Sequence, residues 1–172
     1  MIHAIVVTQF TKMLNNLLAI LGEAEKFAGE KKFDVGILLQ ARLSPDQFSL
    51  VQQIRTACDT AKLGAARLAD REKDVPVHAD TEQTLAEVRA RIESVIAYLK
   101  GFKSDAFAKS ADHRITQPRW NGKSLSGEEF FVQHVIPNFY FHVTTTYAIL
   151  RHNGVPVGKR NYLGTMPYRD PA

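Results

Sequence analysis

The feature that most constrains the fold is a repeated spacing of apolar residues, at alternating steps of three and four, in four separate segments. This spacing gathers apolar side chains on one stripe of a helix. The four predicted helices cover about residues 4–29, 45–70, 80–102 and 127–153. Helices with one apolar stripe each bury it against one another, so the spacing predicts an all-α, antiparallel four-helix bundle. The length of 172 residues is that of a single domain.

Capping residues predict where two of these helices begin and where the last one ends. Ser44 can cap the second helix, with Pro45 in its first turn and Asp46 near its positive end. Ser126 and Glu129 have the spacing of a capping box at the start of the fourth helix. Gly154 is a natural stop for that helix.

The connecting segments are predicted to be irregular. Residues 30–43 contain helix breakers, and residues 103–125 form a long crossover of the kind that is usually packed or functional. The tail, residues 155–172, is rich in turn formers and is predicted to be non-helical. Its apolar content is too high for a disordered segment, so we expect it to lie against its own bundle or a second chain.

Composition argues against several classes of partner. The chain carries 22 basic and 18 acidic residues, a net charge of +4 that is spread without a cluster, so nucleic-acid binding is not expected. The single cysteine, Cys58, lies in an apolar stripe and is predicted to be a core residue. Polar residues interrupt the apolar run at the N-terminus, which predicts neither a membrane span nor a targeting segment. A cytoplasmic protein is therefore expected.

Four polar residues share a face of the fourth predicted helix with its apolar stripe. They are His134, Asn138, His142 and Thr145. The second helix offers polar partners beside its own stripe, namely Gln52, Arg55 and Asp59. These side chains are either ligands of a site or polar groups that are hydrogen-bonded inside the core. We hypothesise that His142, Asn138 and a polar group of the second helix line one interior cavity, which a kink at Pro137 would help to open.

Three stretches resemble a known family. They are "IPNFYFHVTTTYAILRHNGVPVGKRNYLG" (residues 136–164), "SPDQFSLVQQIRTACDTAK" (44–62) and "FDVGILLQARL" (33–43). They are similar to an uncharacterised bacterial family, domain of unknown function 1993 (DUF1993), which is grouped with the DinB-like four-helix bundles. The resemblance implies an up-down-down-up bundle that is frequently a homodimer. It also implies a divalent metal site in many relatives, built from a histidine on the second helix and a His-x-x-x-His pair on the fourth. Some of these relatives act as thiol-dependent transferases.

This sequence departs from the implied metal pattern. The pair on the fourth helix falls on Asn138 and His142, and the second helix has Gln52 or Gln53 at the level of its histidine. One imidazole and two amides are a poor donor set for zinc or nickel, so no metal or other cofactor is expected. The leading interpretation is a small-molecule-binding or structural protein that forms a homodimer. The alternative is a metal- or thiol-dependent transferase or hydrolase with a pocket at His142, and no catalytic residue can be assigned.

Overall fold

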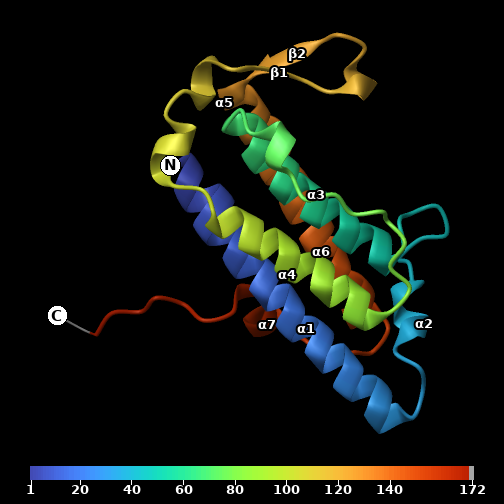
Figure 1. The fold of residues 1–172 in the computed structure, drawn as a ribbon. Helices are drawn as coiled ribbons and strands as arrows, with labels where there is room; N and C mark the ends of the chain where they lie inside the picture. The colour runs from blue at the N-terminus through green and yellow to red at the C-terminus, as the bar shows by residue number, and fades with distance from the viewer. Residues whose placement is uncertain (171–172) are drawn as a thin grey trace.

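Four long helices form the body of the protein in a computed structural model that describes residues 1–170 (Figure 1). They are α1 (Phe10–Lys31), α3 (Leu50–Leu68), α4 (Leu85–Lys100) and α6 (Ile136–His152). A π-helical stretch, Ala4–Gln9, precedes α1 without a break and extends it to 28 residues. The predicted all-α fold is thus confirmed.

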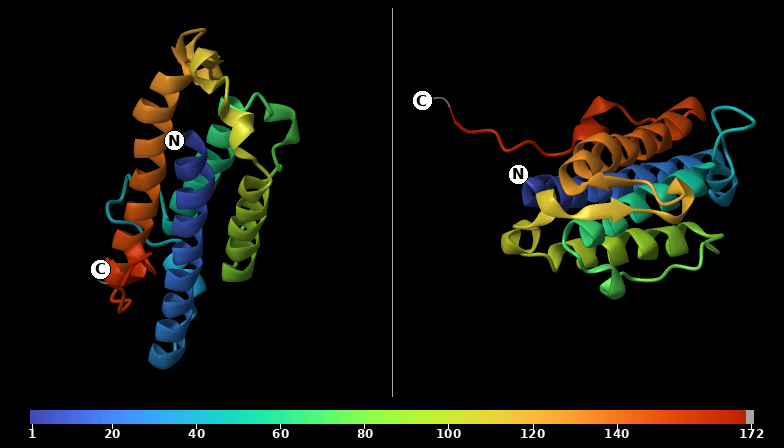
Figure 2. Two further views of the ribbon diagram at one scale, coloured as in Figure 1. Left: turned by 90° about the vertical axis from the view of Figure 1, so that its left-hand side faces the viewer. Right: turned by 90° about the horizontal axis from the view of Figure 1, so that it is seen from above.

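The four helices pack in a ring. Helix α3 contacts α4 on one side and α6 on the other, and α1 closes the ring by contacting both α4 and α6. Helices α1 and α6 run in one direction while α3 and α4 run in the other, which is the up-down-down-up order that the resemblance implied (Figure 1). Figure 2 shows the same bundle from two further sides.

The apolar stripes meet in one core. Phe10 of α1 and Phe139 of α6 are both fully buried, and their rings stack with centroids 3.9 Å apart. Burying an aromatic or aliphatic side chain of this size contributes about 1.5–3 kcal/mol to stability. Cys58 is also fully buried, as predicted for a core residue.

Two helices begin later than the sequence predicted. Helix α3 starts at Leu50 and not at Pro45, because Ser44 and Asp46 are joined in a local turn by a 2.6 Å hydrogen bond between Oγ and Oδ1. Ser49 is the capping residue instead, and Gln52 completes its capping box. Helix α4 starts at Leu85, after Thr84, whose hydroxyl accepts a hydrogen bond from the Glu87 amide.

The fourth predicted helix is continuous but changes its pitch. It consists of α5 (Gly127–Phe130), a π-helical segment (Phe131–Val135) and α6. Ser126 and Glu129 form the predicted capping box at its start. The irregularity expected at Pro137 takes the form of this wider turn, in which the Ile136 amide bonds to the carbonyl five residues back, at Phe131. A wide turn leaves room for a proline ring that carries no N–H.

The long crossover is packed against the end of the bundle and contains strands that the sequence did not predict. Strands β1 (Arg114–Thr116) and β2 (Ser124–Ser126) form an antiparallel hairpin with Ile115 opposite Leu125 (Figure 2). Three 3₁₀ turns complete the crossover, at Ser104–Phe107, Ser110–Asp112 and Pro118–Trp120. Phe107 and Ile115 are buried. A second unpredicted element, the one-turn helix α2 (Gly36–Leu39), lies in the connection before α3, and a further 3₁₀ turn, Glu72–Asp74, follows α3.

The tail also contains a helix, so the prediction that it is wholly non-helical was wrong. Helix α7 (Lys159–Leu163) packs against α1, where the side-chain amide of Asn16 donates a 2.9 Å hydrogen bond to the Tyr162 carbonyl. Val155 and Val157 are buried as well. The tail therefore covers its own bundle up to about Gly164, and the last two of the predicted tail residues, 171–172, lie outside the described part of the chain.

The helix formed by the first π-helical stretch and α1 has the length and composition of a membrane span. Residues Ala4–Lys31 are long enough and apolar enough to cross a bilayer by length and composition alone, which the sequence reading did not expect. Helices in the core of soluble proteins have the same property. Here the apolar stripe of this helix packs inside the bundle, with Phe10, Leu14 and Leu21 fully buried.

Candidate functional site

His142 of α6 is joined to Gln53 of α3 inside the helix interface. The distance between His142 Nδ1 and Gln53 Oε1 is 2.6 Å, and the histidine side chain is only 7% exposed. The amide nitrogen of Gln53 donates to the Phe48 carbonyl at 3.3 Å, which fixes the orientation of the amide and turns its oxygen toward the ring. Nδ1 of His142 must therefore carry the proton that it donates.

This hydrogen bond defines the chemistry that His142 retains. Burial lowers the pKa of His142, so its ring is neutral at neutral pH. With the proton on Nδ1, only Nε2 has a free lone pair, and it can accept a proton or a hydrogen bond. The rings of Phe48 and Phe141 stand beside the imidazole, with centroids 6.4 and 5.1 Å away.

The neighbours of His142 on α6 are occupied in similar contacts. Asn138 donates a 2.6 Å hydrogen bond to the Thr60 hydroxyl of α3. Thr145 and Thr146 donate to carbonyls one turn earlier in their own helix, at 2.7 and 2.8 Å. Asn138 and His142 thus make two separate polar links between α3 and α6, one turn apart. Neither residue lines the cavity of about 370 Å³ near the N-terminus or the cavity of about 510 Å³ beside the start of α3.

The other candidates from the second predicted helix face elsewhere. Gln52 closes the capping box of α3, Arg55 is paired with Glu82 at 2.6 Å, and Asp59 accepts from Arg91 at 2.7 Å. One residue along an α-helix turns the side chain by about 100°. Gln53 therefore faces α6, whereas Gln52 lies on another face of α3. Of the two glutamines considered for this level, Gln53 is the one that contacts His142.

His134 lies apart from His142, at the hairpin end of the bundle. Its Nε2 accepts from Gln117 at 3.2 Å and from Arg119 at 3.3 Å, and the ring of Trp120 lies edge-on to it at 5.6 Å. Positions 134 and 142 are about 12 Å apart along the axis of an α-helix, and the wider π turn also shifts the phase of residues before Ile136 relative to those after it. The prediction from the sequence assumed an unbroken α-helical period.

The residues present do not fit the three-histidine metal site. Its level is occupied by Gln53, Asn138 and His142, and all three side chains already bond to a neighbour inside the helix interface. Among residues 1–170, no three or more His, Cys, Asp or Glu side chains are gathered so that they could hold a metal ion. Cys58 offers no nucleophile, because burial raises the pKa of its thiol to about 12.

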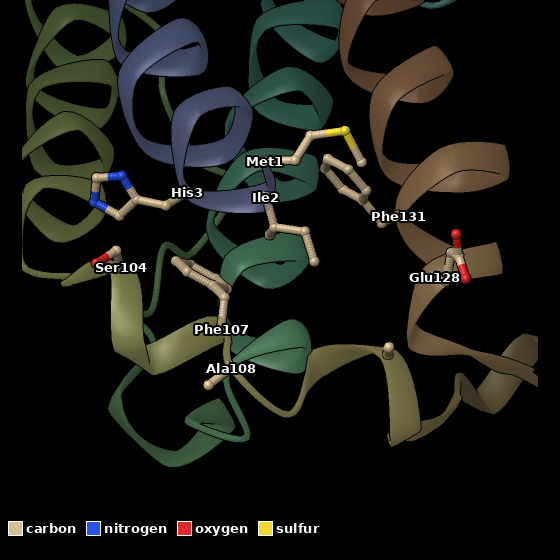
Figure 3. Close-up of a pocket in the computed structure, with 9 residues that line it drawn as sticks. Met1, Ile2, His3, Ser104, Phe107, Ala108, Glu128 and Phe131 are labelled. Atoms are coloured by element: carbon tan, nitrogen blue, oxygen red, sulfur yellow. The ribbon is translucent and has the colours of Figure 1, made fainter.

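A cavity of about 370 Å³ lies where the N-terminus meets the crossover, and we call it the end pocket (Figure 3). Its lining is contributed by three parts of the chain: Met1, Ile2 and His3; Ser104, Phe107, Ala108 and Ala111; and Glu128 and Phe131. In Figure 3, Ile2, Phe107 and Phe131 form the apolar centre, with His3 and Ser104 to one side and Glu128 to the other.

The walls of the end pocket are held by specific contacts. His3 Nε2 lies 3.2 Å from the Phe102 carbonyl and donates to it, and Phe107 stacks on Phe102 with centroids 5.6 Å apart. Gly127 lets the crossover pass close to the start of α5, since a Cβ there would lie 1.6 Å from the Ser110 carbonyl oxygen. The sequence did not predict this pocket. Its one available signal was the apolar content of the crossover.

The chain is similar to known proteins in both sequence and fold. A family model described as "Domain of unknown function (DUF1993)" matches residues 2–163, nearly the whole chain. The chain belongs to this family. The DUF1993 protein is also similar to a solved structure, the crystal structure of a DinB family member from Shewanella denitrificans. The two are 56% identical with a TM-score of 0.95, over 98% of this chain and 95% of the other. No curated protein matches the sequence.

Proposed function

We propose that this DUF1993 protein is a small-molecule-binding bundle and that the end pocket is its binding site. The observation that carries the proposal is the composition of the pocket: an apolar centre of Ile2, Phe107 and Phe131 with a few polar groups at its margin. Ligand pockets in proteins have this composition, and their volumes are about 300–1,000 Å³. The end pocket, at about 370 Å³, suits a small and mainly apolar molecule.

The polar margin suggests how such a ligand would be oriented. His3 and Ser104 lie on one side of the apolar centre and the Glu128 carboxylate on the other (Figure 3). A compact hydrocarbon or aromatic body carrying one hydroxyl or amino group would bury its apolar part and keep that group within reach of the polar side chains on one of these two sides. In this role the protein does not make or break a covalent bond in its ligand.

A transferase or hydrolase at His142 has one observation in its favour. The imidazole is kept neutral by burial, and its Nε2 is free to accept a proton. Against it, the histidine is a hydrogen-bonded part of the helix interface, and its polar neighbours Gln53 and Asn138 have bonds of their own. We therefore favour binding over catalysis.

We also propose that the protein is bacterial and cytoplasmic. The similarity to a protein of Shewanella denitrificans supports the first point. The single cysteine, which is free and buried, is compatible with a reducing compartment.

The proposed binding site can be tested with the fluorescent probe 1-anilinonaphthalene-8-sulfonate. We expect saturable binding by the native protein. Ala108→Trp, which fills the end pocket, should weaken binding by at least about tenfold. Lys109→Trp is the matched control, because this neighbour is exposed and does not line the pocket, and it should bind as the native protein does. Equal affinity of the two variants, with native circular dichroism in both, would refute the site.

A further inference from the structure

A second cavity of about 510 Å³ lies toward the other end of the bundle, and we call it the polar pocket. Its walls come from the α2–α3 connection, the first turns of α3 and the segment before α4, and include Gln40, Arg42, Gln52, Arg55, Glu82 and Gln83. Figure 1 shows α2 and the N-terminus at opposite ends of α1, so this cavity is remote from the end pocket. In contrast to the end pocket, every side chain of its lining except that of Val51 is polar.

The one acidic side chain in this wall is already neutralised. Glu82 Oε2 accepts from Arg55 Nε at 2.6 Å, and its Oε1 accepts from Arg91 Nη1 at 2.9 Å. Burial alone would raise the pKa of Glu82, but the bonds from Arg91, a backbone amide and Arg55 hold the pKa below its usual range. Both carboxylate oxygens are therefore engaged, and Glu82 remains ionised.

The oxygen of Gln52 is likewise engaged. It accepts from the Ser49 backbone amide at 3.0 Å and from the Ser49 hydroxyl at 3.2 Å. The amide nitrogen of Gln52 consequently points away from the capping box. The same bonds close the N-terminus of α3, so the helix end itself is not what a ligand would meet.

Arg42 supplies a positive charge that no carboxylate balances. It is exposed, and it donates through Nη1 to the backbone carbonyl of Gln47, which holds the guanidinium against its own loop. Among the described residues, no acidic side chain forms an ion pair with Arg42. Arg55 and Glu82 cancel each other, so the wall keeps one net positive charge together with hydrogen-bond donors.

We propose that the polar pocket binds a small organic anion through its carboxylate or phosphate oxygens. Guanidinium groups pair with both kinds of oxyanion through parallel N–H donors. The wall offers donors and an uncompensated cation, while the acceptor oxygens of Glu82 and Gln52 are used inside the protein. The cavity is far larger than one inorganic ion, which favours an anionic group attached to a larger polar body.

Backbone-amide NMR shifts of the ¹⁵N-labelled protein test this site, with inorganic phosphate and succinate as separate probes. We expect saturable shifts confined to residues 40–55 and 82–83. Stronger binding of phosphate would identify a phosphate-bearing ligand, and stronger binding of succinate would identify a carboxylate. Arg42→Gln should weaken the better probe by at least about tenfold, because it removes the uncompensated charge and donors.

Two controls keep the test independent of net charge and of the end pocket. Arg114→Gln removes the same charge at the hairpin, far from the polar pocket, and should leave probe affinity within about twofold of native. Ala108→Trp should leave it unchanged as well. No shifts at residues 40–55 with either probe, or equal losses in Arg42→Gln and Arg114→Gln, would overturn the proposal.

Discussion

The hydrogen bond between Gln53 and His142 joins the side chains of two residues across the interface of α3 and α6. Mutations of this pair test how much the bond contributes to stability. Both side chains are buried, so removing one leaves the other without a partner. His142→Leu alone should lower the free energy of unfolding by about 1–3 kcal/mol, because the Gln53 oxygen loses its donor. The double variant Gln53→Leu/His142→Leu should recover much of that loss, since neither side chain of the pair is then left without its partner and only the Phe48 carbonyl loses the donor that Gln53 gave it.

Urea unfolding of the native protein, both single variants and the double variant gives the coupling energy directly. Asn138→Ala provides a comparison, because its partner Thr60 is only half-buried and water can replace the amide. If the losses of the two single variants simply add in the double variant, His142 and Gln53 are not coupled and the structural role assigned to them is wrong.

A second residue-level contact makes stability depend on pH. The ammonium group of the buried Lys62 lies 2.9 Å from the Pro76 carbonyl, 3.0 Å from Asp59 Oδ1 and 2.7 Å from His78 Nδ1. A nitrogen that accepts from an ammonium group must be unprotonated. Burial first, and then the positive charges of Lys62 and Arg91, lower the pKa of His78.

The sign of the effect follows from that lowered pKa. The unfolded chain takes up a proton near the ordinary value of 6.5, whereas the folded chain does so only at lower pH. His78 therefore contributes stability above pH 6.5, and this contribution is lost as the pH falls toward the folded-state pKa. His134 and His142, whose pKa values burial also lowers, add to the same trend. Unfolding measured between pH 5 and 8 should show a shallower slope for His78→Gln than for the native protein, and identical slopes would contradict this role.

At the scale of elements, Arg91 ties α4 to α3 and to the segment between them. It is 3% exposed, and its guanidinium contacts Asp59 at 2.7 Å, Asp80 at 2.5 Å and Glu82 at 2.9 Å. Arg91→Leu would leave these carboxylates facing one another with their main cation removed. We expect a loss of about 3–5 kcal/mol, the range for breaking a buried ion pair by removing one partner.

The matched control is Arg89→Leu, two residues away on the same helix. Arg89 pairs with Glu25, whose side chain is 61% exposed, and such surface pairs contribute about 0–1 kcal/mol. Denaturant midpoints of the two variants should therefore differ widely. A loss below about 1 kcal/mol for both would show that the buried network is not a stabilising link between the elements.

The elements also show which parts of the fold could be predicted from the sequence. The four long helices could, because a buried stripe such as Val6, Phe10 and Met13 repeats over many turns. Their starts were less certain, since Ser44 and Ser49 both suit a cap and only packing selects Ser49. The hairpin strands and α7 have three and five residues, too few for any period to be visible.

The candidate site was only partly predictable for a related reason. The sequence identified the polar face of α6 and two glutamines opposite it. It could not select Gln53 over Gln52, because the side chains of two adjacent residues in an α-helix point in directions about 100° apart. It also placed His134 with His142, since an inserted π turn is invisible in the spacing of residues. The end pocket depends on three segments far apart in the chain, which no local pattern brings together.

Several large apolar side chains remain exposed on the surface of the molecule, and they indicate how the chain assembles. Phe48 is 49% exposed and Phe141 is 56% exposed, and the centroids of their rings lie 6.4 and 5.1 Å from that of the His142 ring. Leu43 and Ile37, on the same connection as Phe48, are also exposed. The tail up to Gly164 covers its own bundle, so the helices and this connection remain as the surface for a partner.

We propose that the protein is a homodimer that pairs through the surface around Phe48 and Phe141. A twofold pair is the commonest soluble assembly, and a stable interface buries about 800 Å² on each partner, with aromatic side chains often at its centre. Light scattering at micromolar concentration should give twice the chain mass of 19.3 kDa. Phe141→Lys should convert the dimer to a monomer, because it brings two like charges into an apolar contact. Val77→Lys, at a side chain that is 94% exposed on another loop, should leave the mass unchanged. A native mass near 19.3 kDa would refute the dimer, and a dimeric Phe141→Lys variant would move the interface to another face.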